Sequence, residues 1–187
     1  MTLSSSMPWQ IGFINIERPG RGVTVSAMGI NGAQLSQWSK WRPGMWEDLA
    51  QTKADLIILA YGTNEAFSGN LDISSTERTW RNYIRQIKNT LPNAGILILG
   101  APESLKTAYG SCGNRPVLLS EVQQMQQRVA HDEKIMFWSW QDAMGGACSM
   151  KNWMAQGLAA KDGVHFSAQG YETAADKLAD SLIRFAQ

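Results

Sequence analysis

The sequence predicts an α/β fold, a three-layer α/β/α sandwich in which a parallel sheet lies between two layers of helices. Short apolar segments alternate along the chain with amphipathic segments of helical period. The apolar segments show no polar alternation, which is typical of strands buried on both faces of a parallel sheet. The 187 residues contain no internal repeat, and this length is typical of one domain with a sizeable core.

The predicted strands are short and apolar. Residues 23–27 (VTVSA) are β-branched and follow a turn-rich RPGRG segment. Residues 55–61, 95–100 and 134–140 are apolar runs of strand length. Residues 11–17 (IGFINIE) are a further candidate, whose place in the strand order the sequence leaves open.

Helical segments separate these strands. Residues 33–41 predict a helix or a turn-rich helical segment. Ser74 and Glu77 form an S-x-x-E capping box, which predicts the start of a helix that ends near Leu91, just before Pro92.

Two further helices are predicted toward the C-terminus. Ser120 and Gln123 form a second capping box, and the last helix is expected to begin near Ser167. Apolar residues at helical spacing define the buried face of each helix: Trp80, Ile84, Ile87 and Leu91, then Val122, Met125 and Val129, then Tyr171, Ala174, Ala175, Leu178 and Leu182.

The composition argues against several classes of protein. Seventeen Lys and Arg against sixteen Asp and Glu leave a net charge of +1, so we expect no nucleic-acid partner. No apolar run is long enough to span a membrane, and the first residues show no signal-peptide pattern. Two cysteines and two histidines are too few for a structural zinc site of those residue types, and we expect neither metal nor cofactor.

In open parallel sheets, ligands bind beyond the carboxyl ends of the strands, which indicates where to look for chemistry. Residues 101–117 and 141–166 are long connections that follow predicted strands. Connections of this length in a compact domain are usually functional.

The most specific pattern is DGVHFS, just before the last predicted helix. Asp162 is spaced so that its carboxylate can accept the imidazole N–H of His165, which leaves the other ring nitrogen free as a general base. The alternative is a helix-entry loop in which the Asp caps the helix and the His has no catalytic role.

Two glycine-containing turns supply further candidates. Gly62 permits a tight turn after a strand, and the Asn64 amide that follows it can donate to a developing oxyanion. Gly29 and Gly32 allow the backbone to approach a ligand, and the N–H of Gly32 can face an anion. Both segments are also compatible with ordinary turns, in which Gly and Asn are common.

Taken together, Gly32, Asn64 and the Asp162–His165 pair resemble the SGNH (GDSL-type) hydrolase superfamily, over residues 23–187. The resemblance implies a flavodoxin-like sheet, His165 as general base and Asp162 as its orienting acid. It further implies an oxyanion hole formed by Gly32 and Asn64, and no cofactor. Glu65 stands where the superfamily usually has Asp.

Four segments carry a narrower resemblance, namely GINGAQL, AYGTNEAF, GGACSM and KDGVHFSAQGY. They are similar to segments of the branch that includes peptidoglycan O-acetylesterases. This resemblance implies an ester hydrolase that acts on an acetylated polysaccharide or other small ester. A periplasmic or cell-envelope location is implied as well. An acetyltransferase of the same fold and a catalytically inactive fragment or binding module are the alternatives.

One departure from the superfamily concerns its nucleophile, because the sequence contains no Gly-Asp-Ser block. The serines at 4–6 lack the preceding strand, and Ser111 lies too far downstream, so the nucleophile is not recognised in this chain. The first central strand is expected to be missing too. We therefore expect residues 23–187 to be the C-terminal part of a hydrolase domain. Residues 1–22 would be a lead-in, the exit from an inserted β-rich module, and an N-terminal part of the same protein would be the partner.

The cysteines and tryptophans complete the candidates. Cys112 and Cys148 lie in the two long connections, either as free thiols or as a disulfide, and the export implied by the resemblance favours the disulfide. Most of the eight tryptophans are expected in the core. Trp140 and Trp153 are the candidates for lining a sugar subsite.

Overall fold

The structure is a computed structural model that describes residue 20 and residues 22–185. Residues 1–31 and residues 32–187 form two separate units. In the first unit, residues 22–31 are exposed and contain neither helix nor strand. The strand predicted at 23–27 is therefore wrong, because no described residue pairs with this β-branched segment to form a ladder. The candidate strand at 11–17 lies outside the described residues.

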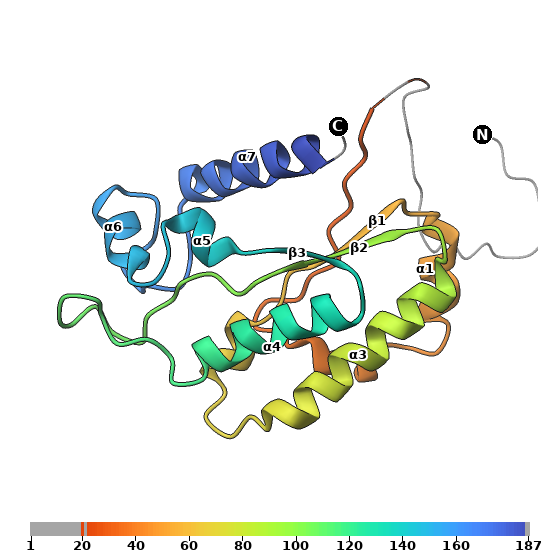
Figure 1. The fold of residues 1–187 in the computed structure, drawn as a ribbon, viewed down its shortest axis with the longest axis horizontal. Coiled ribbons are helices and arrows are strands. Elements are labelled where there is room, and N and C mark those ends of the chain that lie inside the picture. Colours follow the sequence, from red (N-terminus) through yellow and green to blue (C-terminus); the bar gives the residue numbers. More distant parts are fainter. Residues whose placement is uncertain (1–19, 21, 186–187) are drawn as a thin grey trace, which may run out of the picture. The chain divides into compact units, whose positions relative to one another are not determined.

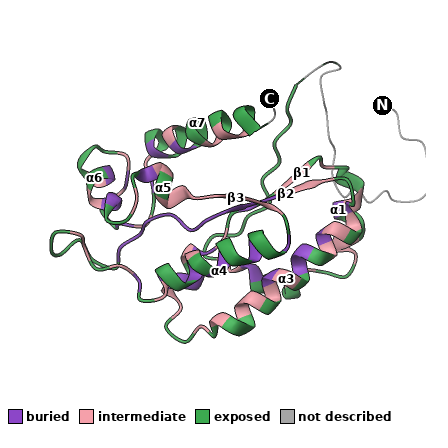
Figure 2. Cartoon of the chain, in the orientation of Figure 1, coloured by how far each residue is buried: buried purple, intermediate pink, exposed green. Residues whose placement is uncertain are grey.

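A three-stranded parallel sheet forms the centre of the second unit, with the strand order β1-β2-β3. Leu56 pairs with Gly95, and Leu97 pairs with Met136. The strands are short and apolar, as predicted, and the middle one is buried along almost its whole length (Figure 2). Their bounds are β1 (Leu56–Leu59), β2 (Gly95–Leu99) and β3 (Met136–Trp138).

One layer of helices covers the face of the sheet that carries Leu59, Ile96 and Ile98 (Figure 1). These side chains share a hydrophobic core with the buried stripes of the two main helices of this layer. The predicted stripes are confirmed here, since Trp80, Ile84 and Val129 are fully buried. The layer consists of the 3-10 helix η1 (Leu35–Lys40) and of α1 (Met45–Thr52), α3 (Ile73–Thr90) and α4 (Leu119–Asp132).

The second layer lies on the opposite side of the sheet (Figure 1) and has its own apolar cluster, which includes Met150, Phe166 and Ala174. Trp138 connects this layer to the sheet, because its indole N–H donates to Ser181 Oγ at 3.2 Å. Two of its helices form within the 141–166 connection. The layer comprises α5 (Trp140–Met144), α6 (Ser149–Ala155) and α7 (Ala168–Phe185).

Both predicted capping boxes are replaced by other contacts. Asp72, not Ser74, caps α3, since its carboxylate accepts the N–H groups of Ser74 and Ser75 at 2.9 and 3.2 Å. In α4, Ser120 lies inside the helix, and the Gln123 amide donates to the Ala101 carbonyl at 2.8 Å. Gln123 thus bonds to a residue outside its helix, while the Ser120 hydroxyl accepts from Arg115 at 3.0 Å.

The last helix is only partly buried, unlike its predicted stripe. Ala174 is buried, whereas Tyr171, Ala175, Ile183 and Phe185 are exposed. The first turn of α7 packs against Phe166 through Tyr171, and Ala174 belongs to the same apolar cluster as Phe166. Among the described residues, no helix is long and apolar enough to cross a membrane.

Candidate active site

His165 and Asp162 form the predicted pair in the turn before α7. His165 Nδ1 lies 2.8 Å from Asp162 Oδ2. The hydrogen bond from His165 and the backbone N–H groups of His165 and Val164 lower the pKa of Asp162 to about 2. An ionised carboxylate only accepts hydrogen bonds, so Nδ1 carries a proton, and in the neutral imidazole Nε2 then has the lone pair that a general base requires.

The loop after β2 packs against this turn. The Leu105 N–H donates to the Gly163 carbonyl at 2.8 Å. Gly163 has φ +71°, and a Cβ there would lie 3.0 Å from Leu105 Cβ, so the turn and the loop approach each other closely. The His165 side chain itself is 72% exposed, and it is therefore accessible to a reactant.

Asn64 lies at the start of α2 (Thr63–Phe67), directly after β1. Its side-chain amide donates to the Ala33 carbonyl at 2.9 Å, and Gln34 Nε2 donates to the Asn64 carbonyl at 3.2 Å. The structure thus brings Asn64 against the residues that follow Gly32. The amide nitrogen has a second hydrogen, which can serve a ligand.

Glu65 stabilises the contact between the Gly32 and Asn64 segments, here called the Gly32–Asn64 corner, as a buried hydrogen-bond acceptor. Its motif position alone did not indicate this role. Its carboxylate is buried and accepts two backbone N–H groups at 2.9 Å, those of Leu35 and Gly62. Burial raises the pKa of Glu65, and the backbone hydrogen bonds oppose this rise. One side chain therefore joins the start of η1 to the turn between β1 and α2.

Gln126 is a second structural residue that the sequence analysis missed. Its fully buried amide donates to the Tyr61 carbonyl at 2.7 Å and accepts the Ala101 N–H at 2.8 Å, so it bridges the ends of β1 and β2. Gly62 is needed beside it, because it has φ +121° and a Cβ there would lie 2.7 Å from Gln126 Nε2. The available signal was a glutamine four residues after Val122, on the buried face of the helix.

The two tryptophans predicted to line a sugar subsite differ in their burial. Trp153 is 5% exposed and donates to the Met144 carbonyl, so it packs in the core and the prediction that it lines a substrate is wrong. Trp140 is half-buried and stacks on Phe166 at 5.4 Å, and its proposed contact with a sugar stays a prediction.

Cys112 and Cys148 form a disulfide, with their Cα atoms 4.8 Å apart. The bond fastens the 101–117 connection to the residue that precedes α6. Disulfides are typical of proteins outside the reducing cytosol, which indicates an extracytoplasmic location.

No serine in the described part of the chain hydrogen-bonds to His165. Ser111 is exposed in the 101–117 connection, and the serines at 4–6 lie outside the described residues. Within residues 20 and 22–185, no cluster of three or more His, Cys, Asp or Glu side chains is suited to a metal ion. The described residues therefore contain a hydrogen-bonded His165–Asp162 pair and an Asn64 amide beside the residues that follow Gly32, and their catalytic roles stay predictions.

Comparison with known proteins identifies a family and a fold for the chain. A model of the GDSL-like lipase/acylhydrolase family matches residues 14–173. A solved structure of a peptidoglycan O-acetylesterase is 68% identical, with a TM-score of 0.84. The match covers 86% of this chain and 46% of that one, so this chain spans less than half the length of that relative.

More distant solved structures show the same fold. A putative GDSL-like lipase from Parabacteroides merdae is 20% identical, with a TM-score of 0.62 over 80% of this chain and 68% of that one. An acetyl xylan esterase is 16% identical, with a TM-score of 0.64 over 82% and 78%. No curated protein matches the chain. The predicted α/β fold with a helix-covered parallel sheet is confirmed.

Proposed function

Because this chain belongs to the GDSL-like lipase/acylhydrolase family, we propose that it supplies the His–Asp pair and the oxyanion hole of an esterase. Its substrate would be an O-acetylated polysaccharide. The observation that carries the proposal is the 2.8 Å contact between His165 Nδ1 and Asp162 Oδ2, which leaves Nε2 as the base.

In the proposed reaction, a serine hydroxyl attacks the acetyl carbonyl while His165 Nε2 accepts its proton. The Gly32 N–H and the Asn64 amide donate to the oxyanion of the tetrahedral intermediate. His165 then returns the proton to the sugar oxygen as the C–O bond breaks. Water, deprotonated by His165, attacks the acetyl-serine and releases acetate, and the proton returns to the serine.

The serine is proposed to come from a part of the protein outside these 187 residues, since they contain no Gly-Asp-Ser block. Two observations support this. The solved relative extends well beyond the matched region. Among the described residues, β1 has a partner only on the β2 side, and Ile58 in this apolar strand is 42% exposed. A further parallel strand beside β1 would end at the same edge of the sheet as Asn64.

The polysaccharide is proposed to be peptidoglycan, and the location to be the periplasm or cell envelope. The 68% identity to a peptidoglycan O-acetylesterase supports the substrate, and the Cys112–Cys148 disulfide supports the location.

The test compares the 187-residue chain with a chimera that carries the preceding part of the 68% identical esterase at its N-terminus. We expect the chain alone to give no turnover of an aryl acetate and no labelling by a fluorophosphonate. The chimera should give both. His165→Ala should lower turnover in the chimera by about 1,000-fold or more.

His131→Ala is the matched control, since His131 also has an aspartate partner, Asp132, 3.0 Å from its Nδ1. This exposed histidine lies at the end of α4, and its substitution should leave turnover unchanged. A folded but inactive chimera, or serine labelling of the chain alone, would contradict the proposal.

A further inference from the structure

The segment that follows β2 is buried although it forms neither helix nor strand. Residues 101–105 are all buried, and Figure 2 shows the chain in purple as it leaves β2. Irregular segments normally lie on the surface, because their backbone polar groups need water or other partners. This segment is therefore held in place by specific contacts with its neighbours.

Both ends of the segment contact the proposed site. At one end, the Ala101 N–H donates to Gln126, the side chain that also bonds to the chain at the end of β1. At the other end, the Leu105 N–H donates to the Gly163 carbonyl at 2.8 Å, inside the turn that carries His165. Residues 101–105 therefore join the two parts of the site to each other.

Glu103 is the one charged residue of this segment, and its side chain is fully buried. One carboxylate oxygen pairs with Arg115 Nε, and the other accepts from Gln141 Nε2 and, at 3.3 Å, from Arg115 Nη2. Arg115 also donates to Ser120 Oγ in α4 at 3.0 Å, whereas Gln141 belongs to α5. One carboxylate thus holds the segment to helices on both faces of the sheet.

The buried charge of Glu103 is better suited to fix a position than to stabilise the fold. The loss of hydration on burial of an ion pair offsets most of the attraction between its charges, so the net stabilisation is small. A carboxylate that meets three donors, however, fixes the directions of all its partners. A cavity of about 300 Å³ borders the cluster at Arg115 and Gln141, so these bonds, more than close packing, hold the segment there.

We propose that Glu103 is a positioning residue, which fixes the His165 turn relative to the Gly32–Asn64 corner through residues 101–105. The turn keeps its own internal bonds and moves as a unit. In the proposed reaction, one acetyl group is served by the base and by the oxyanion donors at once, so a shift of about 1 Å lowers the rate strongly. The effect on rate rests on the proposed function, whereas the effect on geometry does not.

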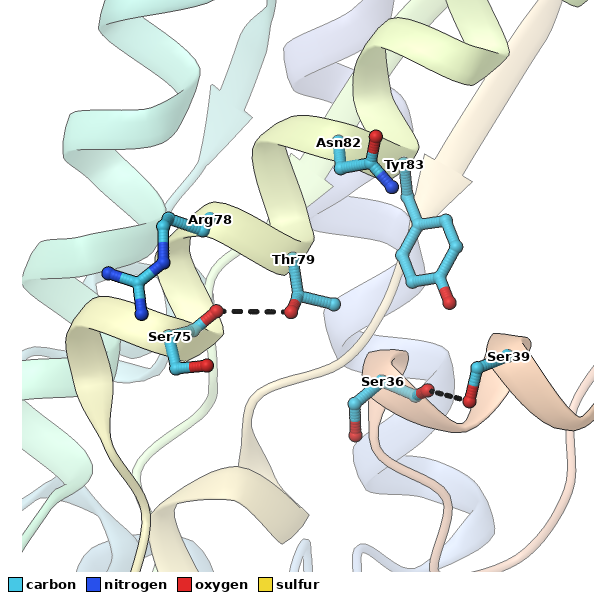
Figure 3. Close-up of a pocket in the computed structure, with 7 residues that line it drawn as sticks. All are labelled: Ser36, Ser39, Ser75, Arg78, Thr79, Asn82 and Tyr83. Carbon is cyan, nitrogen blue, oxygen red and sulfur yellow. Dashed lines mark hydrogen bonds between the residues drawn. The ribbon is translucent and has the colours of Figure 1, made fainter.

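The depression between η1 and α3 offers a contrast, because it is polar but separate from this segment. It has a volume of about 410 Å³, and in Figure 3 the Arg78 guanidinium points away from Tyr83 and from the serines of η1. In the described part of the chain, no hydrogen bond or ion pair joins its lining side chains to residues 101–105. Arg78 therefore provides a control position.

The first test measures geometry in the 187-residue chain by NMR. Glu103→Gln keeps the size of the side chain but has a single acceptor oxygen, so it cannot accept from both Arg115 and Gln141. We expect the Leu105 amide to exchange its hydrogen about tenfold faster. The residual dipolar couplings of residues 162–165 should change relative to those of the residues around Asn64.

Glu133→Gln is the matched control for this test. Glu133 is also a buried acid with two basic partners, since it bonds to Arg85 at 2.9 Å and to Lys88 at 3.3 Å. It follows the C-terminal end of α4, whereas the Glu103 cluster lies at the start of that helix. Its substitution should change neither the exchange of the Leu105 amide nor the couplings.

The second test measures the turnover of an aryl acetate by the chimera. Glu103→Gln should lower kcat about tenfold or more and change KM by less than about twofold, because the lost alignment matters in the transition state. Glu133→Gln and Arg78→Gln should leave both constants unchanged. If Glu103→Gln does not fold, Gln141→Ala removes only the bond from α5 and should cause smaller changes in the same direction.

Unchanged exchange and couplings in the Glu103 variant, or equal changes in the Glu133 variant, would overturn the inference whatever the chimera does. An active chimera whose kcat is insensitive to Glu103 would overturn it as well. An inactive chimera contradicts the proposed function instead, and the NMR comparison of the two glutamate variants then decides the positioning role by itself.

Discussion

At the Asp162–His165 turn, the bonded residues are three positions apart and largely exposed, whereas the Gly32–Asn64 corner depends on contacts across about 30 residues. The turn is a local structure, since Asp162 accepts from the backbone and from the ring of the same short segment. The corner is held by a buried carboxylate, Glu65, that joins two elements.

The difference shows how two parts of a proposed site can depend on different kinds of stability. Substitutions at the turn should change the orientation of the His165 ring and leave the fold nearly intact. Substitutions around the corner should alter the fold first, because buried backbone groups lose their partners.

Glu65→Ala should have the largest effect. It leaves the Leu35 and Gly62 N–H groups without an acceptor, and we expect a loss of about 2 to 4 kcal/mol in the free energy of unfolding. Urea denaturation followed by tryptophan fluorescence measures this loss. Glu121→Ala, at an exposed position of α4, is the control and should change stability by less than about 0.5 kcal/mol. Equal stabilities of the two variants would show that the hydrogen bonds of Glu65 to Leu35 and Gly62 do not stabilise the fold.

Gln126→Leu should have the next largest effect. The substitution keeps an apolar side chain of similar size but leaves the Tyr61 carbonyl and the Ala101 N–H unpaired, at a cost of about 2 kcal/mol. Hydrogen exchange of the Ala101 amide should accelerate in this variant. The matched substitution Gln124→Leu lies at an exposed position of the same helix and should leave that exchange rate unchanged.

The smallest effect, and the sharpest contrast, should appear in the dependence of stability on pH. The lowered pKa of Asp162 stabilises the fold above its ordinary value of 3.8, and this contribution is lost as pH falls from 3.8 toward about 2. Because both partners are largely exposed, the contribution is less than about 1 kcal/mol. The raised pKa of Glu65 acts in the opposite direction, so its contribution falls as pH rises above 4.5.

Urea midpoints measured across pH 2 to 7 separate the two groups. Asp162→Asn should flatten the acid limb of the wild-type curve, and Glu65→Gln should flatten the decline above pH 4.5. Both variants following the wild-type curve would mean that other groups set the pH dependence.

Local and periodic features of the fold could be predicted from the sequence. The Asp162–His165 pair needs only its spacing, and the stripe that includes Trp80 and Ile84 needs only helical period. The first capping box failed because Asp72 caps α3 in place of Ser74, and the second because Gln123 bonds to a residue outside its helix, Ala101. The strand at 23–27 failed because β-branched composition does not by itself supply a neighbouring strand.

Long-range contacts of the site could not be predicted. Glu65 was recognised as a departure from a motif, but its partner Leu35 can be identified only once the start of η1 lies against α2. Trp153 was expected at a surface because it lies in a long connection, yet that connection folds into helices that bury it.

The half-paired strand β1 also bears on how the chain behaves in concentrated solution. Its four residues are all apolar, Ile58 is partly exposed, and no described residue bonds to its second edge. Unpaired N–H and C=O groups on an apolar edge are a template for other strands, including the same strand of another molecule. We therefore expect the chain produced alone to self-associate through this edge at high concentration, and Ile58→Lys to reduce this association, which analytical ultracentrifugation would measure.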